Sequence, residues 1–146
     1  MTRIIKFRAW DKIRKKMVMV DSIHFPLGFV QWQEVAPGEK TNFQSKIENL
    51  ELMQFTDLKD KNGKEIYEGD IVKYLSFSEH KEYKAEVYFR SGCFLVNKSG
   101  LFLSLISMPQ QEINLEMMNT RYYLDRQEEY LCEIIGNIYE NLDLLK

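Results

Sequence analysis

The sequence predicts a mainly β fold, and three observations support this prediction. Short runs in which apolar and polar residues alternate recur at spacings of about 8–12 residues, as in small barrels and sandwiches. Turn-forming Gly, Pro, Asn and Asp residues separate these runs. The length of 146 residues, with 45% hydrophobic and 29% charged content, fits one globular domain or one domain with an appendage. We therefore expect a β-barrel or sandwich with an insertion.

The first predicted element is a β-hairpin with a basic surface. Alternation through residues 4–10 places Ile5, Phe7 and Ala9 on one face of a half-buried strand. A second apolar run, residues 16–20, follows a polar turn and completes the hairpin.

A third strand is predicted at residues 28–33. Its alternation places Phe29 and Gln31 opposite Val30 and Trp32. The stretch from residue 35 to residue 45 is the most loop-like of the chain, and it predicts a mobile loop or a domain edge.

The centre of the chain combines a strand with turn residues. Residues 50–56 predict a strand, and the Asn62-Gly63 pair that follows is the strongest turn signal, because both residues tolerate positive φ. A sharp bend is expected at Gly69, because glycine permits backbone conformations that other residues rarely adopt, and the carboxylate of Asp70 can accept hydrogen bonds from nearby amides. The predicted structural turn motif comprises Asn62, Gly63, Gly69 and Asp70.

The second half of the chain predicts further strands and one helix. The strands are expected at residues 83–90, 92–97, 101–106 and 131–140. Residues 112–130 contain no Gly or Pro, and their apolar spacing is compatible with an amphipathic helix. This helix would form an insertion at about 109–130, before the last strand.

The net charge of −2 conceals a gradient along the chain. Residues 1–20 sum to +6, residues 21–100 to −3 and residues 101–146 to −5. Three interpretations stay open for the basic start: a solvated hairpin face, a contact with an acidic end of the same or another copy, and a phosphate-binding surface. The candidate nucleic-acid or partner contacts are Arg3, Lys6, Arg8, Arg14, Lys15 and Lys16.

Aromatic residues provide a second candidate surface. They make up 13% of the chain, and most are expected to fill the core, although rings interleaved with Lys and Arg also form stacking platforms for single-stranded nucleic acid. Tyr and Arg are favoured anchors of protein interfaces. The candidate protein-contact patch therefore comprises Arg121, Tyr122, Tyr123 and Arg126.

No pattern of catalytic, cofactor-binding or metal-ligating residues emerges. Cys93 and Cys132 are expected to be buried free thiols, with a disulfide between them left open, and they lack zinc-ligand spacing with His24 and His80. The expectation is therefore no enzyme, no cofactor and no metal. A hydrolase that acts through His80 and a neighbouring acid is the distant alternative.

The carboxylates near the central turn are candidates for a cation site. The oxygens of Asp60, Glu68 and Asp70 would suit Mg²⁺ or Ca²⁺, but the surrounding lysines oppose cation capture. The structural turn is the favoured interpretation of these residues.

Three blocks of the sequence resemble the YopX family. Residues 7–11 with 15–17 resemble its amino-terminal signature, residues 52–72 its central block and residues 133–141 its closing strand. The resemblance implies a phage or prophage origin, small uncharacterised relatives, and a mainly β fold with an SH3-like barrel. It implies no catalytic residues. The chain departs from the family pattern between about residues 101 and 129.

These observations lead to an expected organisation and function. Residues 1–50 form an N-terminal β-hairpin extension, and residues 51–146 form the SH3-like β-barrel with its helical insertion, in one compact unit. No apolar run reaches the ~20 residues of a membrane span, and no secretory signal is evident, so a cytoplasmic location in the bacterial host is expected. The expected function is a non-enzymatic binding or assembly module that forms homo-oligomers or binds a phage or host protein. The alternative is a nucleic-acid-binding accessory protein that uses the basic hairpin.

Overall fold

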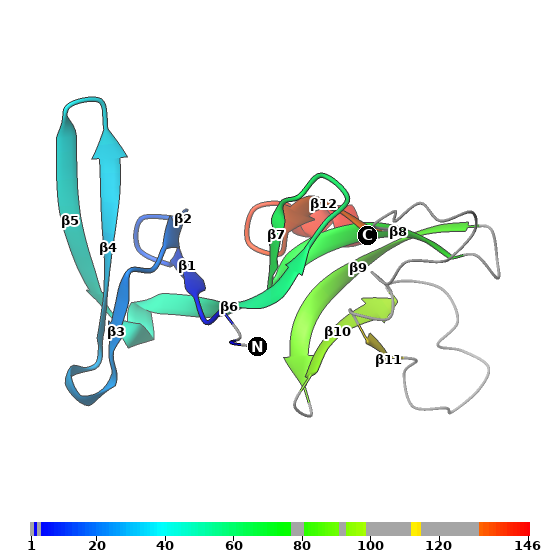
Figure 1. Ribbon diagram of the computed structural model, residues 1–146, viewed down its shortest axis with the longest axis horizontal. Helices are drawn as coiled ribbons and strands as arrows, with labels where there is room; N and C mark the ends of the chain where they lie inside the picture. Colours follow the sequence, from blue (N-terminus) through cyan, green and yellow to red (C-terminus); the bar gives the residue numbers. More distant parts are fainter. Residues whose placement is uncertain (1, 3, 77–80, 91–92, 99–111, 115–131) are drawn as a thin grey trace. The chain divides into compact units, whose positions relative to one another are not determined.

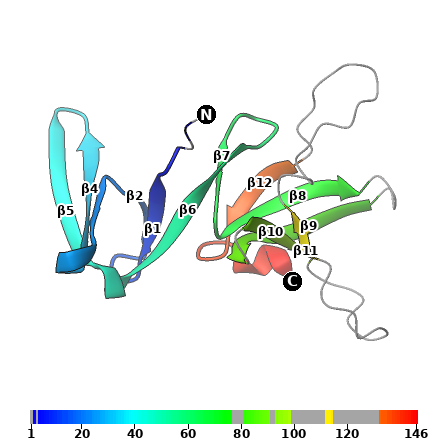
Figure 2. The same ribbon diagram turned by 60° about the horizontal axis from the view of Figure 1, so that its bottom comes forward.

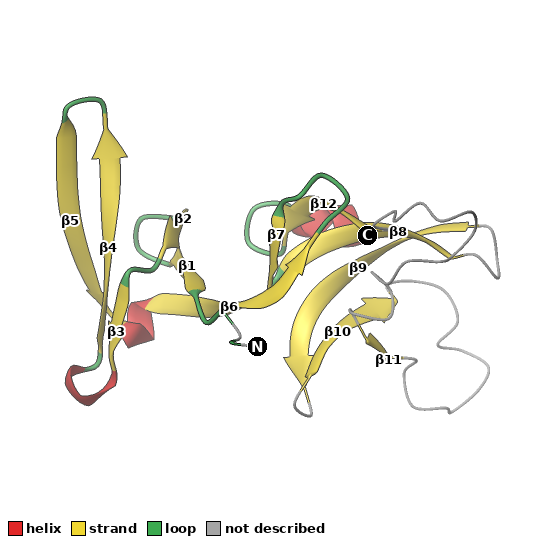
Figure 3. Ribbon diagram, viewed as in Figure 1, coloured by secondary structure: helices red, strands yellow, loops and turns green. Residues whose placement is uncertain are grey.

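The computed structural model describes residues 2, 4–76, 81–90, 93–98, 112–114 and 132–146 (Figure 1). The protein is mainly β, as predicted, and the helices among the described residues are short 3₁₀ turns (Figure 3). The chain divides into two compact units, Met1–Phe55 and Thr56–Lys146. None of the described helices is long and apolar enough to cross a membrane.

Unit 1 (Met1–Phe55) begins with a hairpin. Strand β1 (Phe7–Asp11) pairs antiparallel with β2 (Lys16–Met19), and on its other side with the start of β6 (Leu50–Lys59). The Lys15 amide donates to the Asp11 carbonyl at 2.8 Å, and Lys15 has a φ of 55°. The positive φ closes the hairpin turn, at the strain cost that a left-handed conformation imposes on a non-glycine residue.

The rest of unit 1 is a three-stranded antiparallel sheet in the order β3-β4-β5. Its two long strands, β4 and β5, lie side by side (Figure 2). Its strands are β3 (Ser22–His24), β4 (Phe29–Ala36) and β5 (Glu39–Lys46). The 3₁₀ turn η1 (Phe25–Leu27) connects β3 to β4, and η2 (Ile47–Asn49) connects β5 to β6.

The prediction of a mobile loop at residues 35–45 is wrong. Most of this stretch is β5, which pairs with β4 from Ala36↔Glu39 to Phe29↔Lys46. Pro37 and Gly38 form only the two-residue turn between the strands, where Gly38 adopts a φ of 84°. As an edge strand, β5 is mostly exposed and Phe43 is its one apolar residue, so its sequence lacks the alternation that identifies a half-buried strand.

The core of unit 1 lies between the hairpin and one face of this sheet. It consists of Ala9, Val18, Val30, Trp32 and Leu50, each 5% exposed or less. The alternation predicted for β4 is present, since Val30 and Trp32 are buried while Phe29 and Gln31 are more exposed.

The predicted hairpin face is only partly correct. Ala9 is buried, but Ile5 is 70% exposed because it precedes the first residue of β1.

Unit 2 (Thr56–Lys146) contains a five-stranded antiparallel sheet in the order β11-β10-β9-β8-β12, curled into a half-barrel (Figure 1). The end of β6 and the short strand β7 (Glu65–Tyr67) precede this sheet, and the 3₁₀ turn η3 (Leu142–Leu145) follows it. The five strands are β8 (Asp70–Ser76), β9 (Lys81–Arg90), β10 (Cys93–Lys98), β11 (Glu112–Asn114) and β12 (Cys132–Asn137).

One face of the half-barrel forms the core of unit 2. The cross-strand pairs Val72↔Ala85 and Val87↔Val96 place four fully buried side chains on that face. Paired residues point to the same side of a sheet, so these contacts stabilise the meander from β8 to β10. The core cluster comprises Ile66, Val72, Tyr74, Ala85, Val87, Val96 and Cys132.

The start of the predicted helix is wrong where the structure describes it. Residues Glu112–Asn114 form β11, which pairs with β10. Pairing with a neighbouring strand satisfies the backbone of these residues and overrides their modest helix propensity. The rest of the predicted insertion at 109–130, and the strand expected at residues 101–106, lie outside the described residues.

Candidate functional site

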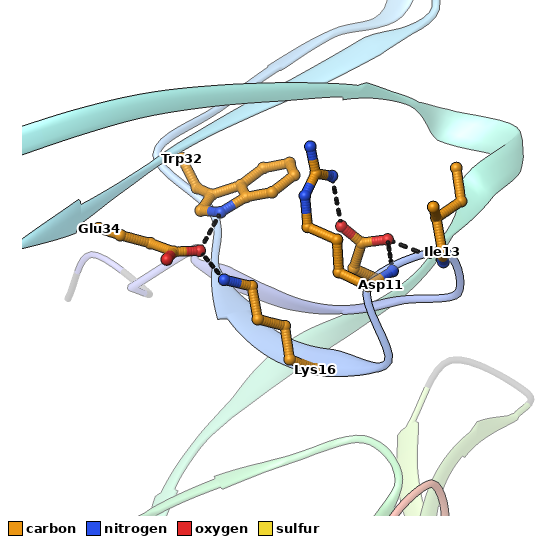
Figure 4. A network of polar contacts seen from close by, with 6 residues as sticks. Asp11, Ile13, Lys16, Trp32 and Glu34 are labelled. Carbon is orange, nitrogen blue, oxygen red and sulfur yellow. Dashed lines mark hydrogen bonds and ion pairs between the residues drawn. The ribbon is translucent and has the colours of Figure 1, made fainter.

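The basic hairpin, the leading sequence candidate, is built around the buried carboxylate of Asp11 (Figure 4). Its Oδ1 accepts the backbone N–H groups of Ile13 at 2.9 Å and of Arg14 at 3.0 Å, and its Oδ2 accepts from Arg14 Nη1 at 2.8 Å. Burial raises the pKa of Asp11, but the hydrogen bonds from Arg14 and Ile13 outweigh burial and hold this pKa below its ordinary value. Asp11 therefore fixes the turn and engages one of the candidate bases.

Lys16 and Glu34 form the second half of this network (Figure 4). The Lys16 ammonium is ion-paired with Glu34, whose Oε1 also accepts from Trp32 Nε1 at 3.2 Å. Hydrogen bonds from Lys16 and Trp32 lower the pKa of the Glu34 carboxyl. The hairpin is thus attached to β4 through charges that the sequence assigned to a binding surface.

Aromatic rings engage the same cations. The Trp32 and Phe43 rings stack with centroids 5.8 Å apart, and the Arg14 guanidinium lies 5.6 Å and 5.4 Å from them. Lys16 Nζ lies 5.5 Å from the Phe43 ring centroid. Such cation–π contacts stabilise by about 0.5–1 kcal/mol at exposed sites. Arg14 and Lys16 consequently act first as structural residues.

The remaining hairpin candidates have different environments. Arg8 is 9% exposed, and Lys6 Nζ lies 4.6 Å from the Phe55 ring centroid. Lys15 is exposed at the turn. Arg3 lies outside the described residues.

Several other candidates fall outside the part of the chain that the structure describes. They are the contact patch Arg121, Tyr122, Tyr123 and Arg126, and His80 of the hydrolase alternative. Of the two cysteines, Cys132 is a free thiol that is fully buried. Burial raises its pKa to about 12, so the thiol is protonated at neutral pH and is not a nucleophile.

The central turn motif is organised by Asp60, which is 1% exposed. Its Oδ1 accepts the amides of Asn62 at 2.8 Å and Lys64 at 2.9 Å, while its Oδ2 accepts the Ile134 amide of β12 at 3.1 Å. Gly63 takes the φ of 78° that the turn requires. One side chain therefore closes the turn and also ties it to a strand that lies far along the sequence.

The other half of the motif closes the start of the half-barrel. Asp70 Oδ2 accepts the Tyr67 amide at 2.8 Å, and Gly69 has a φ of 75°. The Gly69 amide donates to the Val87 carbonyl at 2.7 Å, and the Gly69 carbonyl accepts from the Ile138 amide at 2.9 Å. The carboxylate oxygens of Asp60 and Asp70 thus accept hydrogen bonds from backbone amides. Among the described residues, no group of three His, Cys, Asp or Glu side chains is placed to hold a metal ion.

One polar cluster, which was not predicted from the sequence, lies on the surface of the β3-β4-β5 sheet. Ser22 Oγ lies 3.1 Å from His24 Nε2 and 3.2 Å from Gln31 Oε1, and His24 Nε2 lies 3.3 Å from Gln31 Oε1. The His24 ring stacks on Phe29 with centroids 4.5 Å apart. The alternation in β4 already indicated that Phe29 and Gln31 face away from Val30 and Trp32, but it could not identify the neighbouring strands.

These observations define the class of protein: a small, mainly β protein whose recognisable sequence blocks close turns and join strands. Among solved structures, the crystal structure of protein EF1440 from Enterococcus faecalis is similar, with 28% identity and a TM-score of 0.60, covering 99% of this chain and 100% of that chain. The crystal structure of protein YopX from Bacillus subtilis is similar in fold, with 22% identity and a TM-score of 0.58, covering 97% and 98%.

The family assignment rests on the sequence. The YopX family, described as "YopX protein", matches residues 6–146. The chain therefore belongs to the YopX family, and the resemblance seen in its three sequence blocks is confirmed. No curated protein matches the chain.

Proposed function

We propose that the protein is a non-enzymatic binding and assembly module that associates with further copies of itself through unit 1. It is carried by a phage or prophage and acts in the cytoplasm of the bacterial host, as the family resemblance implies. Unit 2 is an SH3-like barrel that serves as the scaffold, a proposal supported by its curled five-stranded antiparallel sheet. The engagement of Asp60 and Asp70 with backbone amides supports a structural rather than a catalytic role for these carboxylates.

The observation that carries this proposal is the distribution of exposed apolar side chains. Nine large hydrophobic residues are exposed among the residues whose side chains the structure describes, and seven of them lie in unit 1. Exposed apolar surface marks protein interaction sites when it is concentrated rather than scattered. The seven are Ile4, Ile5, Ile13, Met19, Phe25, Leu27 and Val35.

The turn η1 is the best-defined part of this surface. Phe25 and Leu27 are each 72% exposed on either side of Pro26. The Gly28 amide, at a φ of 68°, donates to the His24 carbonyl at 2.8 Å and to the Phe25 carbonyl at 3.2 Å. These bonds fix the turn, so presenting the two side chains to a partner costs little conformational entropy.

Charge supports a second copy as the partner. Unit 1 carries a net charge of +3 and unit 2 a net charge of −5. Opposite charges on two units of one chain favour contacts between unlike units of neighbouring copies, and these contacts weaken as salt screens them.

The test compares the association of two matched double variants by sedimentation velocity. Phe25→Ser with Leu27→Ser removes the apolar side chains of η1, and we expect a shift toward the monomer. Phe89→Ser with Leu142→Ser is the comparison, because it removes the same residue types from exposed positions in unit 2, where a smaller shift is expected. Equal association of both variants and the wild type would contradict the proposal.

A further inference from the structure

The outer face of the β3-β4-β5 sheet is a regular array of polar side chains. Val30 and Trp32 point into the core, so the alternate residues of β4 and their cross-strand partners form the opposite face. We call these residues the outer sheet face. Its rows, read across the strands, are His24–Phe29–Lys46, Ser22–Gln31–Gln44, Gln33–Asn42 and Val35–Lys40.

Most side chains of the outer sheet face are polar. Four of its residues carry side-chain amides, two carry ammonium groups at opposite ends of β5, and none carries a carboxylate. Six residues of this face on β4 and β5 are polar, and five of them are exposed: Gln33 on β4, and Lys40, Asn42, Gln44 and Lys46 on β5. Such a face has little apolar surface for a protein partner, but amides and cations suit a polyanion with hydrogen-bonding edges.

Part of this face is held in place before any ligand arrives. The contacts among Ser22, His24 and Gln31 orient one amide, and stacking of His24 on Phe29 places a ring pair in the same row as Lys46. Proteins that bind single strands combine aromatic rings with a positively charged surface, in some of them on a sheet.

We propose that the outer sheet face binds single-stranded nucleic acid. Lys40 and Lys46 contact phosphates, while the amides of Gln31, Gln33, Asn42 and Gln44 hydrogen-bond to base edges. This binding goes beyond the assembly role. It uses the face of the sheet that points away from the core, and it does not involve Phe25 or Leu27.

The contrast with the basic hairpin favours this face as the nucleic-acid site. Arg14 and Lys16 are committed to Asp11 and Glu34, so using them on phosphate would break the network that joins the hairpin to β4. Lys46 lies 3.5 Å from Glu48, but both side chains are more than 70% exposed, and such a pair contributes little. Lys40 and Lys46 can therefore bind phosphate without the loss of a strong interaction within the protein.

The experiment measures fluorescence anisotropy of a labelled mixed-sequence single-stranded DNA oligonucleotide with the full chain, between about 50 and 200 mM salt. Each phosphate contact to a single strand contributes about 0.7 to the slope of log affinity against log salt. The Lys40→Gln, Lys46→Gln variant should therefore lower the slope by about 1.4. The control, Lys64→Gln with Lys146→Gln, removes the same charge from exposed lysines elsewhere and should keep the wild-type slope.

Three results would overturn the proposal. They are absence of binding at the lowest salt, an equal loss of slope in the control variant, and equal affinity for a duplex of the same sequence. Circular dichroism of each variant shows that the fold is intact. Because the η1 double variant leaves the outer sheet face unchanged, it should bind the oligonucleotide like the wild type even if self-association fails.

Discussion

Asp60 illustrates how one residue joins distant parts of unit 2. Its oxygens accept three backbone amides, two in the turn and one in β12. The sequence identified the turn, because Asn62-Gly63 and a preceding Asp have local turn roles. The bond to Ile134 could not be predicted, since nothing in a single sequence indicates which strand will lie beside the turn.

Replacement of Asp60 tests its role directly. Asp60→Ala leaves buried amides without an acceptor and should lower the free energy of unfolding by about 2–4 kcal/mol in urea titrations. Asp60→Asn keeps one carbonyl oxygen, so it can hold either the turn or β12, and an intermediate loss is expected. A loss within about 0.5 kcal/mol for the Ala variant, as at an ordinary surface site, would contradict this role.

Asp11 makes the stability of the protein depend on pH. Its pKa in the folded state lies below the unfolded value of about 3.9, so its ionised form stabilises the fold above that pH. The contribution is lost as the pH falls through the lowered folded pKa. Asp11→Asn should therefore be less stable than the wild type at neutral pH, and the difference should narrow in acid. Urea titrations of both proteins at neutral and at acidic pH measure this difference in the free energy of unfolding. A difference that does not change with pH would contradict the role of Asp11 ionisation.

Among the strands, those with one buried face were predictable and the edge strand was not. In β4, Val30 and Trp32 face the core, so apolar and polar residues alternate as expected. Seven of the eight residues of β5 are polar, and the eighth, Phe43, stacks on the Trp32 ring. Pairing with β4 determines the conformation of β5, and a tertiary contact of this kind leaves no periodic signal.

The same limit applies to the candidate sites. Basic residues of the hairpin suggested a binding surface because charge is visible in sequence. Their use in ion pairs with Asp11 and Glu34 depends on where β4 lies. The outer sheet face was hidden for the converse reason: its amides come from three strands and adjoin only after the sheet forms.

The end of β12 provides a test at the level of an element. A Cβ on Gly136 would lie 2.6 Å from Asn141 Oδ1 and 2.8 Å from Asn141 Cβ, at the irregularity where β12 shifts register against β8. Gly136→Ala should therefore lower the free energy of unfolding by about 1–3 kcal/mol.

The double variant separates this clash from other effects of the substitution. Asn141→Gly removes the side chain that the new methyl group meets, although it also removes the acceptor of the Asn137 amide. In a double-mutant cycle measured by thermal unfolding, the combined loss should be smaller than the sum of the single losses. Strict additivity would show that the two side chains do not meet.

Over the whole molecule, the two units divide the charge and the exposed apolar surface unequally. Unit 1 is cationic and holds seven of the nine exposed large apolar residues found where side chains are described, whereas unit 2 is anionic and holds the five-stranded sheet. A protein with this division can join copies by contacts between unlike units without changing its fold.

The mass in solution tests this central claim most directly. Light scattering of the wild-type chain is measured across a protein concentration series, at low and at high salt. We expect a mass that is a multiple of 17.5 kDa at low salt and that falls toward 17.5 kDa as salt screens the contacts between units. A mass of one chain at every concentration and salt would contradict self-association.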